Sequence, residues 1–370
     1  MSDLTIKRRW ANLLTHLPSF SAYLKPFIQQ WQPYWRADGF LSQVVAVREE
    51  LTDVYTLVIR PSRRWLGFIA GQHVEINIFN DGVRFSRFFS ISSSPAYYYK
   101  TGLIELSIRE QALGKITPWL KRYYGKHGTR ISNKISLNKA QGNFVLPLGD
   151  ERPTLLIAGG SGVTPFRSML QQLAYSKSNQ SVRLLYFAQN SQQHLFQEEL
   201  KHYAEQHGNI QITFLNDIEH GLVTPELLLQ QCSNITDQKI LICGPAPMIV
   251  ATQQALAQLS VAEEQIQFER FNAAPLSQPK VAVESLQVNF VKSAKAVEVG
   301  GMESKSLLQV AEDAGLNPLS GCRVGVCHQC VCKKASGRVF NTLTGEYSDT
   351  GVGEVQLCVS VAVSDLALEI

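Results

Sequence analysis

The sequence lacks any long hydrophobic run. Of its 370 residues, 45% are hydrophobic, but no uncharged apolar stretch reaches the roughly 18–20 residues that a membrane-spanning helix needs. The basic residues Lys7, Arg8 and Arg9 are not followed by a clean apolar segment or a small-residue cleavage site, so we predict no signal peptide. We therefore expect a protein that stays in the cytoplasm.

A strong charge of one sign is also missing. The net charge is +4, which is too small to favour binding to nucleic acid. With 25 glycines and 15 prolines, the composition excludes collagen-like and largely disordered chains. A globular chain of this length is expected to form two or three domains.

Cysteine is scarce and unevenly placed. There are seven cysteines, an odd number that is too small for a disulfide scaffold of this size. Cys322, Cys327 and Cys330 are separated by four and two residues, and Cys358 follows much later. This is the spacing of plant-type two-iron two-sulfur (2Fe–2S) clusters, which need four thiolates. A zinc site is the alternative, but zinc ribbons usually carry a second Cys-x2-Cys pair, which this sequence does not have.

Composition and periodicity divide the chain into five segments. Short strand-like runs predict an antiparallel β-barrel, and later strands that alternate with helices are typical of a parallel α/β domain. The last part mixes helix with strand and has more acidic than basic residues, the reverse of the rest, which would favour docking between them. The predicted segments are an aromatic and basic extension at 1–36, a barrel at 37–150, an α/β domain at 151–272, a linker at 273–284 and an α+β domain at 285–370.

A glycine-rich turn follows the first predicted strand of the α/β domain. It contains Gly159, Gly160 and Gly162, then Thr164 and Pro165 at the start of a predicted helix. Glycines let the backbone approach a pyrophosphate, and a helix N-terminus offers N–H groups to it. Proline suits a first helical turn, where its missing N–H has no cost. These five residues are candidate nucleotide ligands.

A second turn, Cys243-Gly244-Pro245-Ala246-Pro247-Met248, also follows an apolar strand. The carboxyl ends of parallel strands converge on the ligand crevice of an open sheet. We expect Gly244, Pro245 and Met248 to border a nicotinamide ring and Cys243 to line it. The alternative for Cys243 is a small buried hydrophobic residue.

Upstream, an arginine, two aromatics and a hydroxyl stand together as Arg87-Phe88-Phe89-Ser90. An arginine suits the phosphate of a flavin, an aromatic ring can cover the isoalloxazine face, and a hydroxyl can bond its N5 edge. Gly114 and Thr117 are expected to begin a helix and to add donors for the phosphate. The sequence thus predicts a flavin site on the barrel.

These strings, together with Gly71-Gln72-His73-Val74, resemble the motifs of the ferredoxin–NADP⁺ reductase superfamily, in that family's order, over residues 38–271. The resemblance implies a flavin-binding barrel followed by a pyridine-nucleotide domain. It also implies that Glu269 and Phe271, at the family's last strand, approach the flavin.

The full domain order ends in a ferredoxin domain, expected to have a β-grasp fold, and is similar to oxygenase reductases of the phthalate dioxygenase reductase type. With its extension, the chain most resembles bacterial NADPH oxidoreductases that serve stearoyl-CoA desaturases. The implied path runs from NAD(P)H to flavin, to the 2Fe–2S cluster and to a partner oxidase. We expect a membrane fatty-acyl desaturase of the di-iron type as that partner, with a ring-hydroxylating or other oxygenase as the alternative. An alternative of another class is a nucleotide- or redox-sensing binding module.

The residues nearest the chemistry are expected to be Ser90 near flavin N5, Cys243 at the nicotinamide, and Glu269. The run Tyr97-Tyr98-Tyr99 could stack an adenine, which favours FAD over FMN. The run Ala188-Gln189-Asn190-Ser191 has no acid to bind a free ribose 2′-hydroxyl, which favours NADPH over NADH.

The extension at 1–36 combines Trp, Tyr and Phe with basic residues, a composition that suits a membrane interface. One hypothesis is peripheral contact with the inner face of the membrane, where a membrane oxidase would be met. The alternative is an ordinary cap packed on the barrel.

Overall fold

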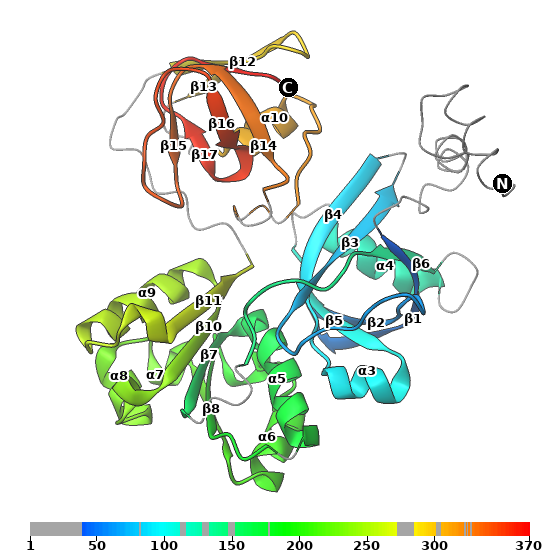
Figure 1. Ribbon diagram of the computed structural model, residues 1–370, viewed down its shortest axis with the longest axis vertical. Helices are drawn as coiled ribbons and strands as arrows, with labels where there is room; N and C mark the ends of the chain where they lie inside the picture. Colours follow the sequence, from blue (N-terminus) through cyan, green and yellow to red (C-terminus); the bar gives the residue numbers. More distant parts are fainter. Residues whose placement is uncertain are drawn as a thin grey trace, which may run out of the picture.

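The computed structural model describes residues 39–370 apart from 81–82, 112–115, 128–132, 147–151, 177, 272–284, 301–304, 322, 324 and 326–327. The predicted extension and linker therefore lie outside the described residues, as do Gly114, Cys322 and Cys327. The described chain forms three bodies, blue to cyan, green to yellow, and orange to red in Figure 1. None of its helices has both the length and the apolar character that crossing a bilayer requires.

The first body is the predicted antiparallel barrel. Its strands, all paired antiparallel in the order β4-β3-β6-β1-β2-β5, are β1 (Phe40–Leu51), β2 (Val54–Arg60), β3 (His73–Asn80), β4 (Val83–Ser90), β5 (Ile104–Arg109) and β6 (Lys134–Leu137). The edge strands β4 and β5 lie close together, so the sheet curls around one apolar core. Helix α4 (Thr117–His127) contributes Leu120 and Tyr124 to that core, and the short helix α3 (Pro95–Thr101) lies outside it.

The second body is a doubly wound sheet in the order β11-β10-β7-β8-β9, with all strands parallel. Its strands are β7 (Thr154–Gly159), β8 (Val182–Ala188), β9 (Ile210–Asn216), β10 (Lys239–Gly244) and β11 (Ile266–Arg270). Its helices are α5 (Val163–Ser176), α6 (Gln197–Gln206), α7 (Asp217–His220), α8 (Pro225–Gln231) and α9 (Ala246–Gln258).

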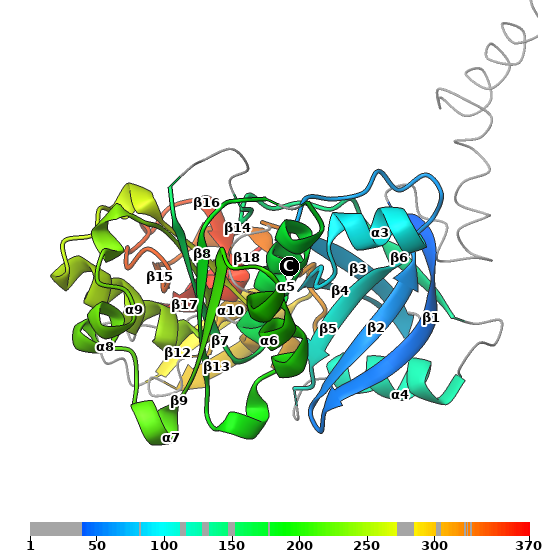
Figure 2. The ribbon, with the colours of Figure 1, turned by 90° about the horizontal axis from the view of Figure 1, so that it is seen from below.

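Strands buried on both faces read as continuous apolar runs, because helices cover a parallel sheet on each side. Helices α5 and α6 pack on one face, and α8 and α9 pack on the other; Figure 2 shows both layers. The strand order switches between β7 and β10: β8 and β9 follow on one side of β7, and β10 and β11 lie on its other side. The turns after β7 and β10 therefore meet at the place where such sheets bind ligands.

The third body is the α+β domain that the sequence predicts. Its larger sheet has the order β13-β12-β18-β14-β16, in which the β12–β18 pair is parallel, and a second sheet pairs β15 with β17. The strands are β12 (Ser285–Phe290), β13 (Lys295–Gly300), β14 (Val331–Ser336), β15 (Val339–Asn341), β16 (Gly353–Gln356), β17 (Ser360–Ala362) and β18 (Leu366–Leu368). Helix α10 (Leu307–Asp313) begins at a capping box of Ser306 and Gln309 and buries Leu307 and Leu308 in the domain core.

A buried ion pair joins the second body to the barrel. Arg167 on α5, 5% exposed, contacts Glu105 of β5 (Nη1–Oε2 2.6 Å) and Glu199 of α6 (Nε–Oε2 2.8 Å). Burial by itself would raise the pKa of Glu105, but Arg167, helped by Arg48, lowers it below its ordinary value. The Arg167–Glu105 pair holds α5 on the barrel wall, and the Arg167–Glu199 pair joins α5 to α6 within the second body.

Candidate functional site

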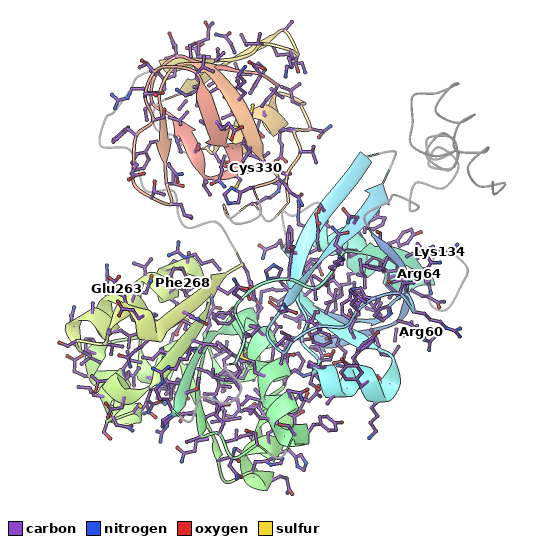
Figure 3. The ribbon with its side chains drawn as sticks, viewed as in Figure 1. Arg60, Arg64, Lys134, Glu263, Phe268 and Cys330 are labelled. Atoms are coloured by element: carbon purple, nitrogen blue, oxygen red, sulfur yellow. The ribbon has the colours of Figure 1, made fainter. Side chains whose placement is uncertain are left out.

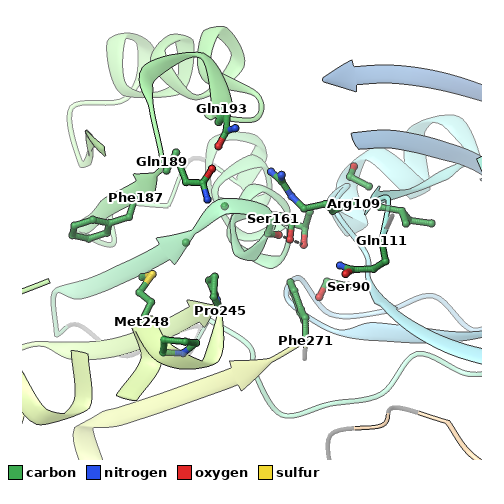
Figure 4. Close-up of a pocket in the computed structure, with 18 of the residues that line it drawn as sticks. Ser90, Arg109, Gln111, Ser161, Phe187, Gln189, Gln193, Pro245, Met248 and Phe271 are labelled. Carbon is green, nitrogen blue, oxygen red and sulfur yellow. Dashed lines mark hydrogen bonds between the residues drawn. The ribbon is translucent and has the colours of Figure 1, made fainter. Parts of the chain in front are cut away.

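A cavity of about 610 Å³ lies between the barrel and the parallel sheet. Figure 4 shows that side chains from both bodies converge on it, with Ser90 and Arg109 on the barrel side and Met248 and Pro245 on the other. Its volume is within the range of small-molecule sites. The turns after β7 and β10 form its far wall, which is the crevice expected for an open parallel sheet.

On the barrel side, all four residues of the Arg87-Phe88-Phe89-Ser90 string line this cavity. They form the end of β4, whose last residue is Ser90. The pKa of Arg87 is lowered to about 10, first by burial and then by the positive charge of Arg323. A bound anion would relieve both effects, so the position fits a flavin phosphate.

Thr117 also lines the cavity, at the first residue of α4. The Tyr55 hydroxyl donates to the Thr117 carbonyl over 2.7 Å and so holds the start of that helix against the barrel. Arg109 and Gln111 line the same wall, and the sequence analysis missed both. They belong to no recognisable string, and only their place at the end of β5 brings them here.

In the glycine-rich turn, Gly159, Gly160 and Thr164 line the cavity, whereas Gly162 and Pro165 do not. Gly160 has a φ of +53° and open space where a Cβ would stand, so a ligand can approach its backbone. A Cβ on Gly162 would meet the Cys243 carbonyl at 2.1 Å. Gly162 therefore serves close packing, and Pro165 is buried within α5.

In the second turn, Gly244, Pro245 and Met248 line the cavity as predicted, but Cys243 does not. Cys243 is fully buried in the core shared with α5. Burial, and then the negative charge of Glu269, raise the pKa of its thiol. Its side chain lies in the packing between sheet and helix, where the alternative of a small buried hydrophobic residue fits it.

A second cavity, of about 1240 Å³, lies where all three bodies meet. Phe88, Ser90 and Phe271 line both cavities. Glu269 lines the second one, where its carboxylate contacts His73 Nδ1 at 2.9 Å and accepts a hydrogen bond from the Ser90 hydroxyl at 3.4 Å. Ser90 and Glu269 are therefore close together at the wall of the second cavity.

The three tyrosines proposed for adenine stacking lie elsewhere. Tyr97, Tyr98 and Tyr99 belong to α3 and line neither cavity. Tyr98 packs edge-on against Trp65 with ring centroids 5.3 Å apart. The sequence showed an aromatic run, but a Ser94 cap and a proline make it a helix that packs on the barrel.

Three further residues line the first cavity at the carboxyl ends of neighbouring strands: Gln189 and Gln193 after β8, and Asp217 after β9. The loop after β8 carries no carboxylate between Ala188 and Ser191. Asp217 was not predicted, because it follows the third strand rather than the second.

In the third body, Cys330 and Cys358 are both buried, with their sulfur atoms 3.2 Å apart. Around them, the cluster loop has three described residues with left-handed backbone, Arg323, Gly325 and His328. Such turns direct successive N–H groups to one side and form concavities that bind anions and iron–sulfur groups. Cys330 ends this loop, and Cys358 lies on the separate short helical segment Leu357–Val359. Two neighbouring buried thiols fit a cluster, and Figure 3 places Cys330 at the end of the domain that faces the other two bodies.

Comparisons with known proteins agree with this arrangement. Residues 156–254 match the family model "Oxidoreductase NAD-binding domain". The chain is 28% identical to an NADPH oxidoreductase of Mycobacterium tuberculosis, over 91% of this chain and 86% of that protein. It is 29% identical to the ferredoxin reductase component of 3-ketosteroid-9-alpha-monooxygenase from the same species, over 82% and 85%.

Among solved structures, phthalate dioxygenase reductase, described as a modular structure for electron transfer from pyridine nucleotides to [2Fe–2S], matches 90% of this chain and 98% of its own. The TM-score is 0.60 at 19% identity, so this likeness concerns the fold. The three-body architecture of barrel, parallel sheet and ferredoxin-like domain is thus confirmed. Fold, cavity and comparisons together identify the chain as an NAD(P)H oxidoreductase, a flavin-dependent reductase that transfers electrons.

Proposed function

We propose that the chain is the reductase component of an oxygenase system. NAD(P)H gives up two electrons and a proton as hydride and leaves as NAD(P)⁺; the two electrons go singly to the partner oxygenase, and the proton goes to solvent. The observation that carries the proposal is the first cavity, which has a flavin-type wall on β4 and nucleotide-type turns after β7 and β10. The adjoining domain holds paired buried thiols.

Two bound groups would supply the change from paired to single electrons: FAD, which accepts hydride, and a 2Fe–2S cluster, which carries one electron at a time. FAD would be held by Arg87 at its phosphates, by Phe88 and Phe89 at its ring system, and by donors at Gly114 and Thr117. Cys322, Cys327, Cys330 and Cys358 would be the four cluster ligands.

For the nucleotide, we propose that Gly159, Gly160 and Thr164 receive the pyrophosphate, with Gly162 and Pro165 keeping the turn tight. Gly244, Pro245 and Met248 would border the nicotinamide, and Phe271 would cover the flavin until the nicotinamide ring binds. NADPH is the proposed donor, because the loop after β8 has no carboxylate and Arg109 lines the same cavity. Steady-state kinetics with NADPH and NADH test this, and a large preference for NADH would overturn it.

Ser90 is the proposed hydrogen-bond partner at the reacting edge of the flavin. Its hydroxyl and the Glu269 carboxylate lie 3.4 Å apart, so Glu269 can orient it and exchange a proton with it. His73 contacts the other carboxylate oxygen and fixes its direction. We assign no reacting role to Cys243.

For the partner, we favour an oxygenase over a desaturase. The relatives named above include a monooxygenase reductase component, and the matching fold includes a dioxygenase reductase. A desaturase, and membrane contact through residues 1–36, remain predictions that nothing in the described residues supports. Reconstitution of NADPH-dependent turnover with purified candidate oxygenases and desaturases tests the choice.

The purified protein itself gives the first test of the proposal. It should be yellow-brown, should contain one FAD and two irons per chain, and should reduce cytochrome c with NADPH. A preparation that binds nucleotide but reduces cytochrome c only slowly would point to a sensing module instead. A colourless protein with zinc in place of iron would overturn the cluster assignment.

A further inference from the structure

The cluster loop reaches the barrel through a direct hydrogen bond. The Gln329 side-chain amide donates to Glu75 of β3, with an Nε2–Oε1 distance of 2.9 Å. The two residues are 254 positions apart in the chain, so only the docking of one domain on the other brings them together. Both line the second cavity, beside His73 and Glu269.

Glu75 is an unusual acceptor, because it is a carboxylate only 2% exposed to solvent. The Ser86 hydroxyl and the Asn138 side-chain amide also donate to it. All three donors are neutral, and a buried carboxylate depends strongly on each hydrogen bond that replaces water. Undocking the domain would remove one of the three, so Glu75 favours the docked arrangement.

The contact also lies between the two proposed redox sites. In the β3–β4 ladder, Glu75 is paired with Phe88, which lines both cavities. On the other side, Gln329 directly precedes Cys330, one of the proposed cluster ligands. The hydrogen bond therefore joins β3, the strand paired with the proposed flavin wall on β4, to the loop of the cluster.

Other charges at this junction oppose docking. Arg323 of the cluster loop is close enough to Arg87 of β4 for its positive charge to lower the pKa of Arg87, after the effect of burial. Glu312, which pairs with Arg323, offsets part of that repulsion. The charges of Arg87 and Arg323 thus do not favour docking, whereas the Glu75–Gln329 hydrogen bond does.

We propose that Glu75 and Gln329 are positioning residues that dock the C-terminal domain on the barrel in the arrangement that passes electrons from flavin to cluster. This inference rests on the proposed function for the electron path, but the docking contact itself does not. Neither residue touches the nucleotide turns, so hydride transfer should not depend on them.

The test uses the full-length holoprotein with Q329A, Q329E and the exchanged pair E75Q/Q329E. Q287A, an exposed glutamine on β12 of the same domain, is the matched control. Rapid mixing with NADPH follows flavin bleaching and cluster reduction separately. Hydrogen exchange of the peptide that contains β3 reports docking without reference to activity.

We expect flavin bleaching within twofold of wild type in every variant. Cluster reduction should slow roughly tenfold in Q329A, because one hydrogen bond to a charged group is lost. It should slow further in Q329E, where two carboxylates meet, and recover in E75Q/Q329E, where the amide and carboxylate are exchanged. Hydrogen exchange of the β3 peptide should increase in Q329A, increase further in Q329E and recover in E75Q/Q329E. In Q287A it should stay unchanged.

Wild-type cluster reduction and β3 exchange in both Q329A and Q329E would overturn the proposal. So would a failure of the exchanged pair to improve on Q329E, or an equal slowing of flavin bleaching. Should E75Q/Q329E not fold, Q329A against Q329E still gives the predicted order. A protein without iron would remove the proposed function, while the exchange data would still decide whether this contact docks the domain.

Discussion

At the scale of single residues, Ser90 is the side chain most directly placed for chemistry. It is 4% exposed, lines both cavities and donates to Glu269. We expect S90A to lower the rate of flavin reduction by NADPH roughly 10- to 100-fold, because a donor at the reacting edge is removed. Stopped-flow flavin bleaching measures the rate, and fluorescence titration should show unchanged FAD affinity. S285A, at an exposed position of β12 outside both cavities, is the control, and equal rates in both variants would contradict the assignment.

Lys334 is a second residue with a defined role, in this case in the stability of the C-terminal domain. Its ammonium is 1% exposed and donates to the carbonyls of Gly337, Asp349 and Gly351 over 2.6–2.7 Å. We expect K334M to destabilise the C-terminal domain by about 1–3 kcal/mol, because three turn carbonyls lose their shared charged donor. Thermal unfolding measures this, with K333M, which is half exposed, as the control. A melting temperature of K334M within a degree or two of that of K333M would contradict this explanation.

At the scale of elements, the packing of α5 on the barrel depends on Arg167. We expect R167M to cost about 2–4 kcal/mol, since it leaves the buried Glu105 carboxylate with only the partly exposed Arg48 as a cationic partner. K201M, which removes an exposed ion pair within α6, should cost less than about 1 kcal/mol. Denaturant unfolding followed by tryptophan fluorescence compares the two. If both variants unfold at the same midpoint, the buried pair is not what holds these elements together.

The same pair predicts how stability depends on pH. The folded-state pKa of Glu105 is lowered, so its contribution is present above the unfolded-state value of about 4.3. That contribution is lost as pH falls from there through the lowered folded-state pKa, because protonation then costs the ion pair. Melting temperatures measured between pH 6 and pH 3 should fall more steeply for wild type than for R167M. Parallel curves would show that another group governs the acid transition.

At the scale of the whole molecule, the two redox parts should be separable. We expect C358A to abolish the cluster but to leave NADPH oxidation with ferricyanide, which accepts electrons from flavin, within about threefold of wild type. Reduction of cytochrome c and of the partner oxygenase should fall at least tenfold. Iron analysis and electron paramagnetic resonance check the loss of the cluster. Equal loss of both activities would mean that the domains do not work as separate modules.

Much of this architecture could be predicted from sequence, because local patterns carry it. Apolar runs such as Thr154–Gly159 and glycine turns after them specify a parallel sheet with its crevice. The direction in which a side chain points was harder to predict. Cys243 follows the expected strand, but its side chain is buried in the core. Arg109 and Asp217 belong to no motif, and only long-range packing brings them to the cavity.

The wall formed by Phe88, Ser90 and Phe271 has a practical consequence for redesign. These three side chains line both cavities. Substitutions made there to accept a different nucleotide in the first cavity would therefore also change the second cavity, next to the C-terminal domain. Gln189 and Gln193 line the first cavity but not the second, so nucleotide preference is better changed at these two residues than at the wall shared by both cavities.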